Sequence, residues 1–415
     1  MRKKIKASDL QIGMHLDELC GSWMDHPFWR SKFILTQVDD IRRILDSGIS
    51  EVWIDIAKGV DVAVKVPDTP VISPPLHDTL VEAPKPVSRM EELKRAAMIC
   101  KQAKKAVVSM FREARMGNAI NAEAAGELVD EISSSVVRNP GALISLARLK
   151  TADDYTYMHS VAVCALMVAL GRQLGLNEQE VKEAGMAGLL HDLGKAMMPI
   201  KVLNKPGKLT DDEFRIIKSH PVEGHRMLLE GNSVSDIVLD VCLHHHEKVD
   251  GSGYPDKLTG DQISLYAKMG AVCDVYDAIT SNRPYKAGWD PAESIRKMSE
   301  WSKGHFDEKV FQAFIKSIGI YPVGSLVKLA SGRLAVVIEQ SEKSLLAPHV
   351  KVFFSTKSQT RIVPELIDLS HPGTSEKTLA ARMRPAGVSP IWMRSGRTEP
   401  MLQTPCTRQL HIILV

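Results

Sequence analysis

The sequence predicts a mainly α protein, a helical bundle with a small N-terminal α/β domain and a small C-terminal β unit. Helical periodicity runs through most of residues 119–320. Prolines concentrate within residues 66–90, a composition typical of an extended linker, and so separate the bundle from residues 1–65. After Pro322 the apolar residues alternate instead, as they do in strands. The 415 residues suffice for two or three domains of roughly 100–200 residues each.

Residues 1–65 predict a small accessory domain. Residues 33–35 and 51–56 are strand-like, and residues 39–47 are helical with Gly48 at the C-terminal cap position. This segment carries no cluster of catalytic side chains, so we expect a regulatory or docking role.

A connecting amphipathic helix is expected over residues 91–118, after the linker at 66–90, because apolar residues recur among charged ones there. Such a helix packs on the next domain or on a partner subunit, or it lies on a membrane surface. The sequence favours packing.

The bundle at residues 119–320 is followed by the β unit at residues 321–370, with strands expected at 325–329 and 334–338. Thr210 and Glu213 have capping-box spacing at the start of one helix. The last stretch, residues 371–415, has no visible period and is expected to be disordered or to result from an altered reading frame. The helices of the bundle are expected over residues 122–138, 155–174, 178–190, 211–229, 235–246 and 263–281.

Charge and cysteine usage exclude several classes of protein. Lys and Arg number 53 against 50 for Asp and Glu, and this net charge of +3 is too near balance to argue for a nucleic acid polymer or a membrane surface as partner, so no nucleic acid polymer is expected. The 6 cysteines are scattered without a close pair, so we expect neither disulfides nor a cysteine zinc site. The longest apolar run, residues 161–170, is too short for the ~20 residues of a membrane span. With no export signal, a cytoplasmic location is expected.

Potential metal ligands recur in or beside the predicted helices of the bundle. Burying so many imidazoles and carboxylates without partners would be costly, and shared metal ions remove that cost. The candidate ligands are His159, His191, Asp192, His220, His245, His246 and Asp274.

Nitrogen and oxygen donors without cysteine suit Fe, Mn or Zn. Seven donors exceed what one ion takes from protein, so two divalent ions are expected, Fe or Mn being preferred. Two ions roughly 3.5–4 Å apart could share Asp192 and hold a hydroxide between them, an arrangement used for in-line attack on phosphorus. The donors therefore predict metal-assisted hydrolysis of a phosphoester.

Two flanking features extend the candidate site. Lys195 follows the His191-Asp192 pair and either reaches a phosphate oxygen or serves as a helix C-terminal charge. After His246 comes a loop whose glycines allow a close approach of backbone to ligand, either as a simple turn or as a substrate-facing wall.

The motifs HDLGK at residues 191–195 and HHEKVDGSGYP at residues 245–255 resemble the HD-GYP family, a bacterial branch of the HD phosphohydrolases that hydrolyses cyclic di-GMP. The resemblance covers roughly residues 125–320, and the N-terminal module resembles the accessory region of some members. It implies the same seven metal ligands, with Asp192 and Lys195 as catalytic residues.

The resemblance also implies substrate contacts. Arg283 and Lys286 match family positions that hold substrate phosphate, and Gly253 and Tyr254 match the loop that borders the substrate. Glu247 resembles a position that orients ligand imidazoles.

One position departs from the family pattern. Members with three metals have a glutamate one helical turn before the first histidine, where this chain has Tyr155. Asp154 is adjacent, but at 100° per residue it is offset from His159 by about 140°. A two-metal centre is therefore expected.

The resemblance implies hydrolysis of cyclic di-GMP to linear pGpG, and on to GMP if the second phosphodiester is also cut. One rival hypothesis is a non-catalytic sensor or scaffold that binds the dinucleotide or diguanylate cyclase partners. Another is a phosphohydrolase of the broader HD group acting on other nucleotides. The complete ligand set with Lys195 favours the enzyme over the sensor, and the GYP loop argues against the third hypothesis.

Overall fold

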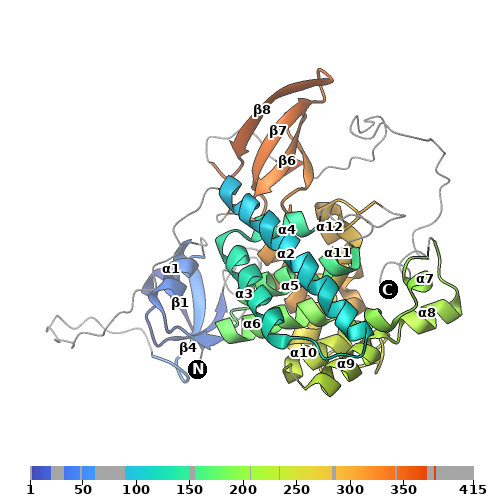
Figure 1. The fold of residues 1–415 in the computed structure, drawn as a ribbon. Helices are drawn as coiled ribbons and strands as arrows, with labels where there is room; N and C mark the ends of the chain where they lie inside the picture. The colour runs from blue at the N-terminus through green and yellow to red at the C-terminus, as the bar shows by residue number, and fades with distance from the viewer. Residues whose placement is uncertain are drawn as a thin grey trace. The chain divides into compact units, whose positions relative to one another are not determined.

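The computed structural model describes most of the chain in two compact units (Figure 1). The first unit comprises Met1–Ser88 with Arg172–Leu176, and the second comprises Arg89–Gly171 with Asn177–Val415. The described residues are 2–19, 32–46, 49–60, 89–148, 155–205, 207–232, 234–282, 287–341, 344–371 and 378–379.

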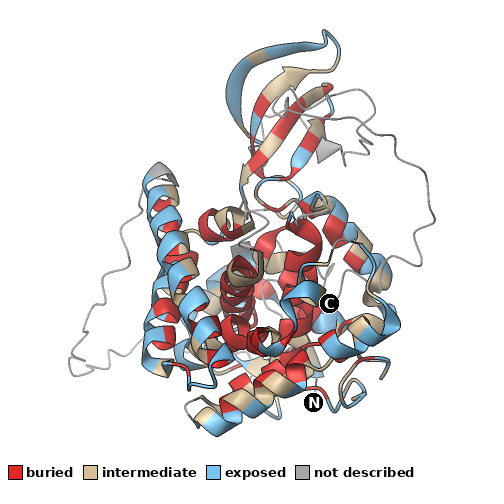
Figure 2. Ribbon diagram, turned by 45° about the vertical axis from the view of Figure 1, so that its right-hand side comes forward, coloured by how far each residue is buried: buried red, intermediate tan, exposed pale blue. Residues whose placement is uncertain are grey.

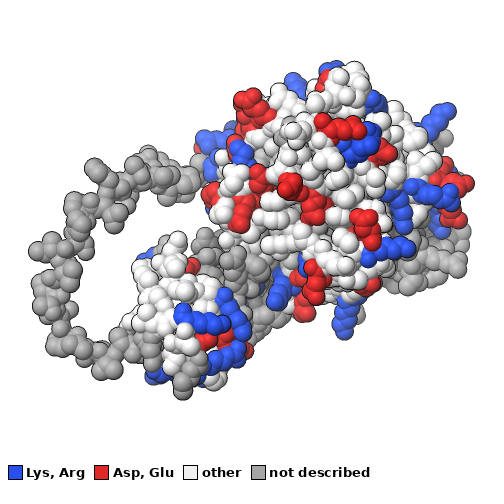
Figure 3. Space-filling view, turned by 90° about the horizontal axis from the view of Figure 1, so that it is seen from below, with Lys and Arg blue, Asp and Glu red and all other residues white. Residues whose placement is uncertain are grey.

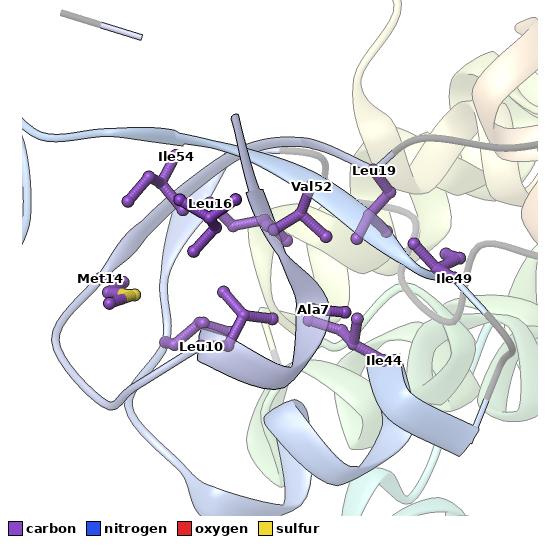
Figure 4. Packing of buried hydrophobic residues seen from close by; sticks show 11 residues of the cluster. Ala7, Leu10, Met14, Leu16, Leu19, Ile44, Ile49, Val52 and Ile54 are labelled. Carbon is purple, nitrogen blue, oxygen red and sulfur yellow. The ribbon is translucent and has the colours of Figure 1, made fainter. Parts of the chain in front are cut away.

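The first unit is an antiparallel sheet of order β1-β4-β2-β3 with one α-helix. Figure 4 shows its core, in which side chains such as Leu16, Ile44 and Ile54 lie fully buried. The small α/β domain expected at this end is confirmed. Its elements are β1 (Arg2–Lys6), the 3-10 turn η1 (Ala7–Asp9), β2 (His15–Leu19), β3 (Phe33–Ile34), α1 (Val38–Asp46) and β4 (Glu51–Asp55).

Strands β1 and β2 are absent from the sequence prediction because charged residues hide their alternation. In β1 only Ile5 is buried, between lysines. In β2 the buried Asp17 lies at a register shift between Leu16 and Glu18, and it pairs with Arg2 and Lys32. The extra residue interrupts the alternation of buried and exposed side chains, so a search for hydrophobic periodicity misses this strand.

The second unit is predominantly helical, which confirms the predicted fold class. In Figure 2 buried residues concentrate in the inner helices of the bundle and exposed residues on the outer ones. The α-helices are α2 (Arg89–Arg115), α3 (Ala122–Arg138), α4 (Pro140–Arg148), α5 (Tyr155–Gln173), α6 (Glu178–Leu190), α7 (Ile200–Leu203), α8 (Asp211–Ile217), α9 (His220–Gly231), α10 (Asp236–His244), α11 (Leu265–Thr280), α12 (Pro291–His305) and α13 (Glu308–Ile318), with a 3-10 helix η4 (Leu193–Met197) after α6.

Helix α2 packs against α3, α4 and η4, as the favoured interpretation of the connecting helix expects. Near its start the buried Glu92 accepts hydrogen bonds from Arg138 and Ser135 of α3. Near its end the Arg115 guanidinium donates to the carbonyl of Ala196 in η4, at 2.9 Å. The apolar face of α2 is therefore covered by protein.

The helix expected over residues 211–229 is wrong as a single element, since α8 ends at Ile217 and α9 begins at His220. Pro221 lies in the first turn of α9. Proline lacks an N–H and clashes with the preceding turn, so a helix can begin at Pro221 but cannot run through it. The break places His220 at a helix start.

The C-terminal β unit is an antiparallel sheet of order β8-β7-β6-β5-β9 around a core that includes Leu329, Val337 and Val350. The strands at residues 325–329 and 334–338 are confirmed, and β7 and β8 were not foreseen. Arg148 joins the sheet to the bundle by donating to the carbonyl of Val323 at 3.2 Å. The strands are β5 (Leu326–Leu329), β6 (Arg333–Glu339), β7 (His349–Ser355), β8 (Thr360–Asp368) and β9 (Thr378–Leu379).

The expected linker at 66–90 lies outside the described residues up to 88, and within residues 371–415 only 371 and 378–379 are described. Among the described residues, none of the helices is long and apolar enough to cross a bilayer. Figure 3 shows acidic and basic side chains interspersed over the face of the helical bundle in view, in keeping with the near-balanced charge.

Candidate metal centre

His159 lies in α5, a helix buried along almost all of its length. Its Nε2 is 2.9 Å from Asp274 Oδ1, and its Nδ1 is 2.6 Å from Asp277 Oδ2, both on α11. Burial by itself lowers the pKa of His159, but hydrogen bonds to Asp274 and Asp277 outweigh burial and leave that pKa raised. The two aspartates therefore hold both nitrogens of this ring.

His191 and Asp192 follow directly after α6. The Nδ1–H of His191 donates to the carbonyl of Gly188 at 2.8 Å, which leaves Nε2 turned to Asp192 Oδ2 at 3.4 Å. Burial lowers the pKa of His191 to about 3. The ring is thus neutral and has a free lone pair on Nε2, the form in which histidine binds metals.

His220 and His245 are oriented in the same way as His191, by a hydrogen bond from Nδ1 to a backbone carbonyl. Their Nδ1–H groups donate to the carbonyls of Ile217 and Val241, at 2.8 and 3.0 Å. Their Nε2 atoms lie 3.3 Å apart and 3.2 and 3.7 Å from Asp192 Oδ1. A backbone acceptor on Nδ1 fixes the tautomer and aims Nε2, as is usual for metal-bound histidines.

His246 completes this side of the cluster. Its Nδ1 is 3.8 Å from Asp274 Oδ2, and its buried Nε2 has no hydrogen-bond partner among the described residues. Burial and the neighbouring His245 hold the pKa of His246 well below its usual value. An unpaired, neutral, buried nitrogen is costly unless it binds something.

Asp192 lies at the centre of the cluster and is buried. Lys195 donates to its Oδ2 at 2.8 Å. Burial raises the pKa of Asp192, but the charge of Lys195 and the surrounding histidines lower that pKa by more than burial raises it. The net pKa is therefore well below the usual value. The carboxylate is therefore ionised.

Two groups of donor atoms share Asp192. Within each group the atoms all lie within 4.8 Å of one another. The sequence-predicted ligands are thus brought together, and imidazole nitrogens around an ionised carboxylate suit a divalent metal. The first group is Asp192, His220, His245 and His246, and the second is His159, His191 and Asp192.

The loop after His246 closes one side of the cluster. The Tyr254 ring stacks on the His246 ring with centroids 4.7 Å apart, and the backbone N–H of Tyr254 donates to the His246 carbonyl. Its hydroxyl is buried and has no hydrogen-bond partner within the described ranges. A Cβ at Gly253 would lie 2.5 Å from the backbone of Glu247 and Lys248, so only glycine fits there.

Glu247 does not orient imidazoles, contrary to the sequence expectation. Its carboxylate accepts the N–H groups of Asp256, Lys257 and Leu258, at 2.7, 2.9 and 3.1 Å. These three N–H groups follow the cis peptide bond between Tyr254 and Pro255. They lie outside any helix or strand, so no regular backbone hydrogen bonds are available to them. Glu247 therefore orders the loop that follows His246.

Arg283 and Lys286, the expected phosphate contacts, lie outside the described residues, as does Asp154. Tyr155 is described, and its ring stacks on His159 with centroids 5.8 Å apart and planes 8° apart. The position where three-metal members have a glutamate is thus taken by a ring that covers the first histidine.

Two residues escaped the sequence analysis. The carboxylate of Asp277 binds Nδ1 of His159. The sequence could have indicated this residue, because it lies three positions after Asp274 and so shares its helix face. Gly194 allows η4 to touch α9, because a Cβ there would lie 1.9 Å from the His220 carbonyl oxygen. No sequence pattern predicted that contact, because it joins two segments that are separated along the chain.

Comparisons with known proteins identify relatives of this chain. Residues 2–125 match the family model described as a domain of unknown function (DUF3391), and residues 135–310 match the HD domain model. The chain is 56% identical over 378 residues to the cyclic di-GMP phosphodiesterase PA4108 of Pseudomonas aeruginosa, covering 91% of each. It is 39% identical over 179 residues to the cyclic di-GMP phosphodiesterase response regulator RpfG of Xanthomonas campestris, covering 41% of this chain and 47% of that one. Among solved structures it is similar to the HDG"Y"P protein Bd1817 of Bdellovibrio bacteriovorus, with a TM-score of 0.46, 16% identity and coverage of 76% and 99%.

Proposed function

The chain belongs to the HD-GYP family of cyclic di-GMP phosphodiesterases, and we propose that it hydrolyses cyclic di-GMP to linear pGpG at the cluster around Asp192. Conversion on to GMP would require a second cut at the same site. In the first cut a water oxygen bonds to phosphorus, the bond from phosphorus to a ribose 3′ oxygen breaks, and that oxygen takes up a proton.

The observation that carries this proposal is the sharing of Asp192 by two groups of donors. Such sharing supports two ions rather than one. We propose iron or manganese, which nitrogen and oxygen donors suit. When bound, such ions lower the pKa of water and offset the negative charge of phosphate. The residues that would hold them are His159, His191, Asp192, His220, His245, His246 and Asp274.

The chain's own side chains would bind and orient the dinucleotide. Lys195 lies beside Asp192 and can also donate to a phosphate oxygen as a compact positive charge. Gly253 and Tyr254 form the wall next to His246. Arg283 and Lys286 would contribute further charge to the phosphates. A cytoplasmic location for this activity stays a prediction.

The test is turnover of cyclic di-GMP by anaerobically purified protein loaded with Mn²⁺ or Fe²⁺, with metal counted per chain and products separated. Asp192→Ala removes the shared donor, so we expect loss of hydrolysis by more than about 1,000-fold, as when an essential catalytic group is deleted. Helix content, measured by circular dichroism, should stay unchanged.

The matched control is Asp212→Ala, because the Asp212 side chain is exposed on α8 and, among the described residues, forms an ion pair with Arg215 alone. That variant should keep wild-type turnover. Hydrolysis by metal-loaded Asp192→Ala would refute the assignment. Wild-type protein that binds metal and dinucleotide without turnover would favour the sensor hypothesis instead.

A further inference from the structure

Lys218 is a positive charge beside the site that no role yet explains. It follows the last residue of α8 and lies two residues before His220. Its Nζ is 4.7 Å from the Tyr254 ring centroid and 4.8 Å from that of Phe214. Across the described ranges it forms cation–π contacts with these rings and no ion pair with a carboxylate.

The contact with Tyr254 places Lys218 at the proposed substrate wall. Tyr254 stacks on His246, so ring contacts lead from the ammonium group to a member of the donor cluster. Lys218 is also half-buried. A helix C-terminal charge needs only solvent and the helix dipole, whereas this ammonium group is held over the ring that would border the substrate.

Lys195 and Lys218 differ in what already binds their charge. Lys195 is engaged by the buried carboxylate of Asp192 at 2.8 Å. Within the described part of the chain, the Lys218 ammonium group contacts ring faces alone, which attract a cation weakly and leave its N–H groups able to donate. A phosphate oxygen is a stronger partner for such an ammonium group than an aromatic face.

Cyclic di-GMP carries two phosphodiesters, and the proposed reaction cuts one of them at the cluster beside Lys195. We propose that Lys218 binds the second phosphodiester of the cyclic dinucleotide, beside Tyr254. This inference rests on the proposed function. Arg283 and Lys286 follow α11, whereas Lys218 follows α8, so the contributions of the two segments can be separated by mutation.

The test compares KM values for cyclic di-GMP and for bis(p-nitrophenyl) phosphate, which has a single phosphodiester. Lys218→Met keeps an unbranched apolar stem against the two rings and removes only the charge. It should raise the KM for cyclic di-GMP about tenfold or more with kcat nearly constant, because the lost contact is made equally in ground and transition states. The KM for the single phosphodiester should change far less.

Two further variants sharpen the comparison. Lys218→Arg keeps the charge and should stay within about twofold of the wild-type KM. Lys309→Met removes an exposed lysine of α13 and should leave the KM for cyclic di-GMP unchanged. The KM for cyclic di-GMP should also rise less steeply with salt in Lys218→Met than in wild type, because one charged contact is gone.

An unchanged KM in Lys218→Met overturns the inference. So does a parallel loss for both substrates, or a fall in kcat, since either would mean that Lys218 acts by packing Tyr254. If wild type binds cyclic di-GMP without turnover, the proposed function fails alone, and calorimetric Kd values of wild type and Lys218→Met decide the inference. If wild type neither cuts nor binds it, both fail.

Discussion

The histidines of the cluster differ in what holds their Nδ1 atoms. His191, His220 and His245 each donate to a backbone carbonyl within the preceding turn, so their orientation follows from local chain geometry. His159 depends instead on the carboxylate of Asp277, which comes from another helix. A charged acceptor makes the ring more basic and ties its orientation to the packing of α5 on α11.

Asp277→Asn keeps a side chain of the same shape but replaces the charged acceptor of His159 with a neutral amide. We expect metal affinity and turnover to fall about 10- to 100-fold, as when outer partners of metal ligands are lost. Metal titration and turnover measure this, with Asp261→Asn in an exposed turn as control. Wild-type metal affinity in Asp277→Asn would contradict the role given to this residue.

At the scale of elements, the cluster depends on direct backbone contact between η4 and α9. Gly194 lies against the backbone of His220, and a Cβ on Gly224 would come within 3.0 Å of the Gly194 nitrogen. Neither helix could approach so closely with larger residues. The contact sets the distance between Asp192 at the start of η4 and His220 at the start of α9.

Gly194→Ala should therefore separate the two elements. The free energy of unfolding is expected to fall by at least the ~1–3 kcal/mol typical of overpacking, because the added Cβ clashes with backbone atoms that cannot rotate away. Urea unfolding and metal content per chain measure the effect, and both should fall.

Gly126→Ala in α3 is the matched control, since among the described residues a Cβ there would meet only the side-chain ends of Met186 and Lys182 in α6, at 3.8 and 3.9 Å. It should be neutral or stabilising by up to about 1 kcal/mol, the helix propensity difference between Gly and Ala. If Gly194→Ala were equally well tolerated, the close contact would not be what spaces the cluster.

At the scale of the whole molecule, the metal centre lies in the core rather than on a surface. Its imidazoles and carboxylates are contributed by α5, α9, α11 and the segments that end α6 and α10, so each bound ion would join most of the bundle. Binding to the folded state alone stabilises that state by mass action, about 2.7 kcal/mol when the ligand is at 100 times its Kd.

Removal of metal with EDTA should lower the Tm of the helical bundle, measured by circular dichroism at 222 nm with and without added Mn²⁺. The fall follows because the bound ions offset the cost of burying the cluster's polar groups. Asp192→Ala should show little response to EDTA, because it lacks the shared donor. Equal Tm values for wild type in both conditions would mean that the cluster folds without help from metal.

Local patterns in the sequence determined much about this protein. Helical periodicity predicted the bundle, alternation predicted both small β-containing parts, and the HD and GYP motifs predicted the family that the 56% identical relative confirms. The seven donors were predicted because each is a ligand-type side chain in or beside a predicted helix. Pro221 marks the break between α8 and α9, although helical periodicity continues across it.

Tertiary structure alone decided which segments meet. The hydrogen bond between Asp277 and His159, the contact of Gly194 with His220, the hydrogen bonds of Glu247 to the loop and the position of Lys218 over Tyr254 each join residues 9 to 118 positions apart. The physical reason is that periodicity records which face of an element is apolar, whereas packing selects the neighbour that face receives. The sequence thus determines which ligand types the site contains, and the tertiary structure determines which residues orient them.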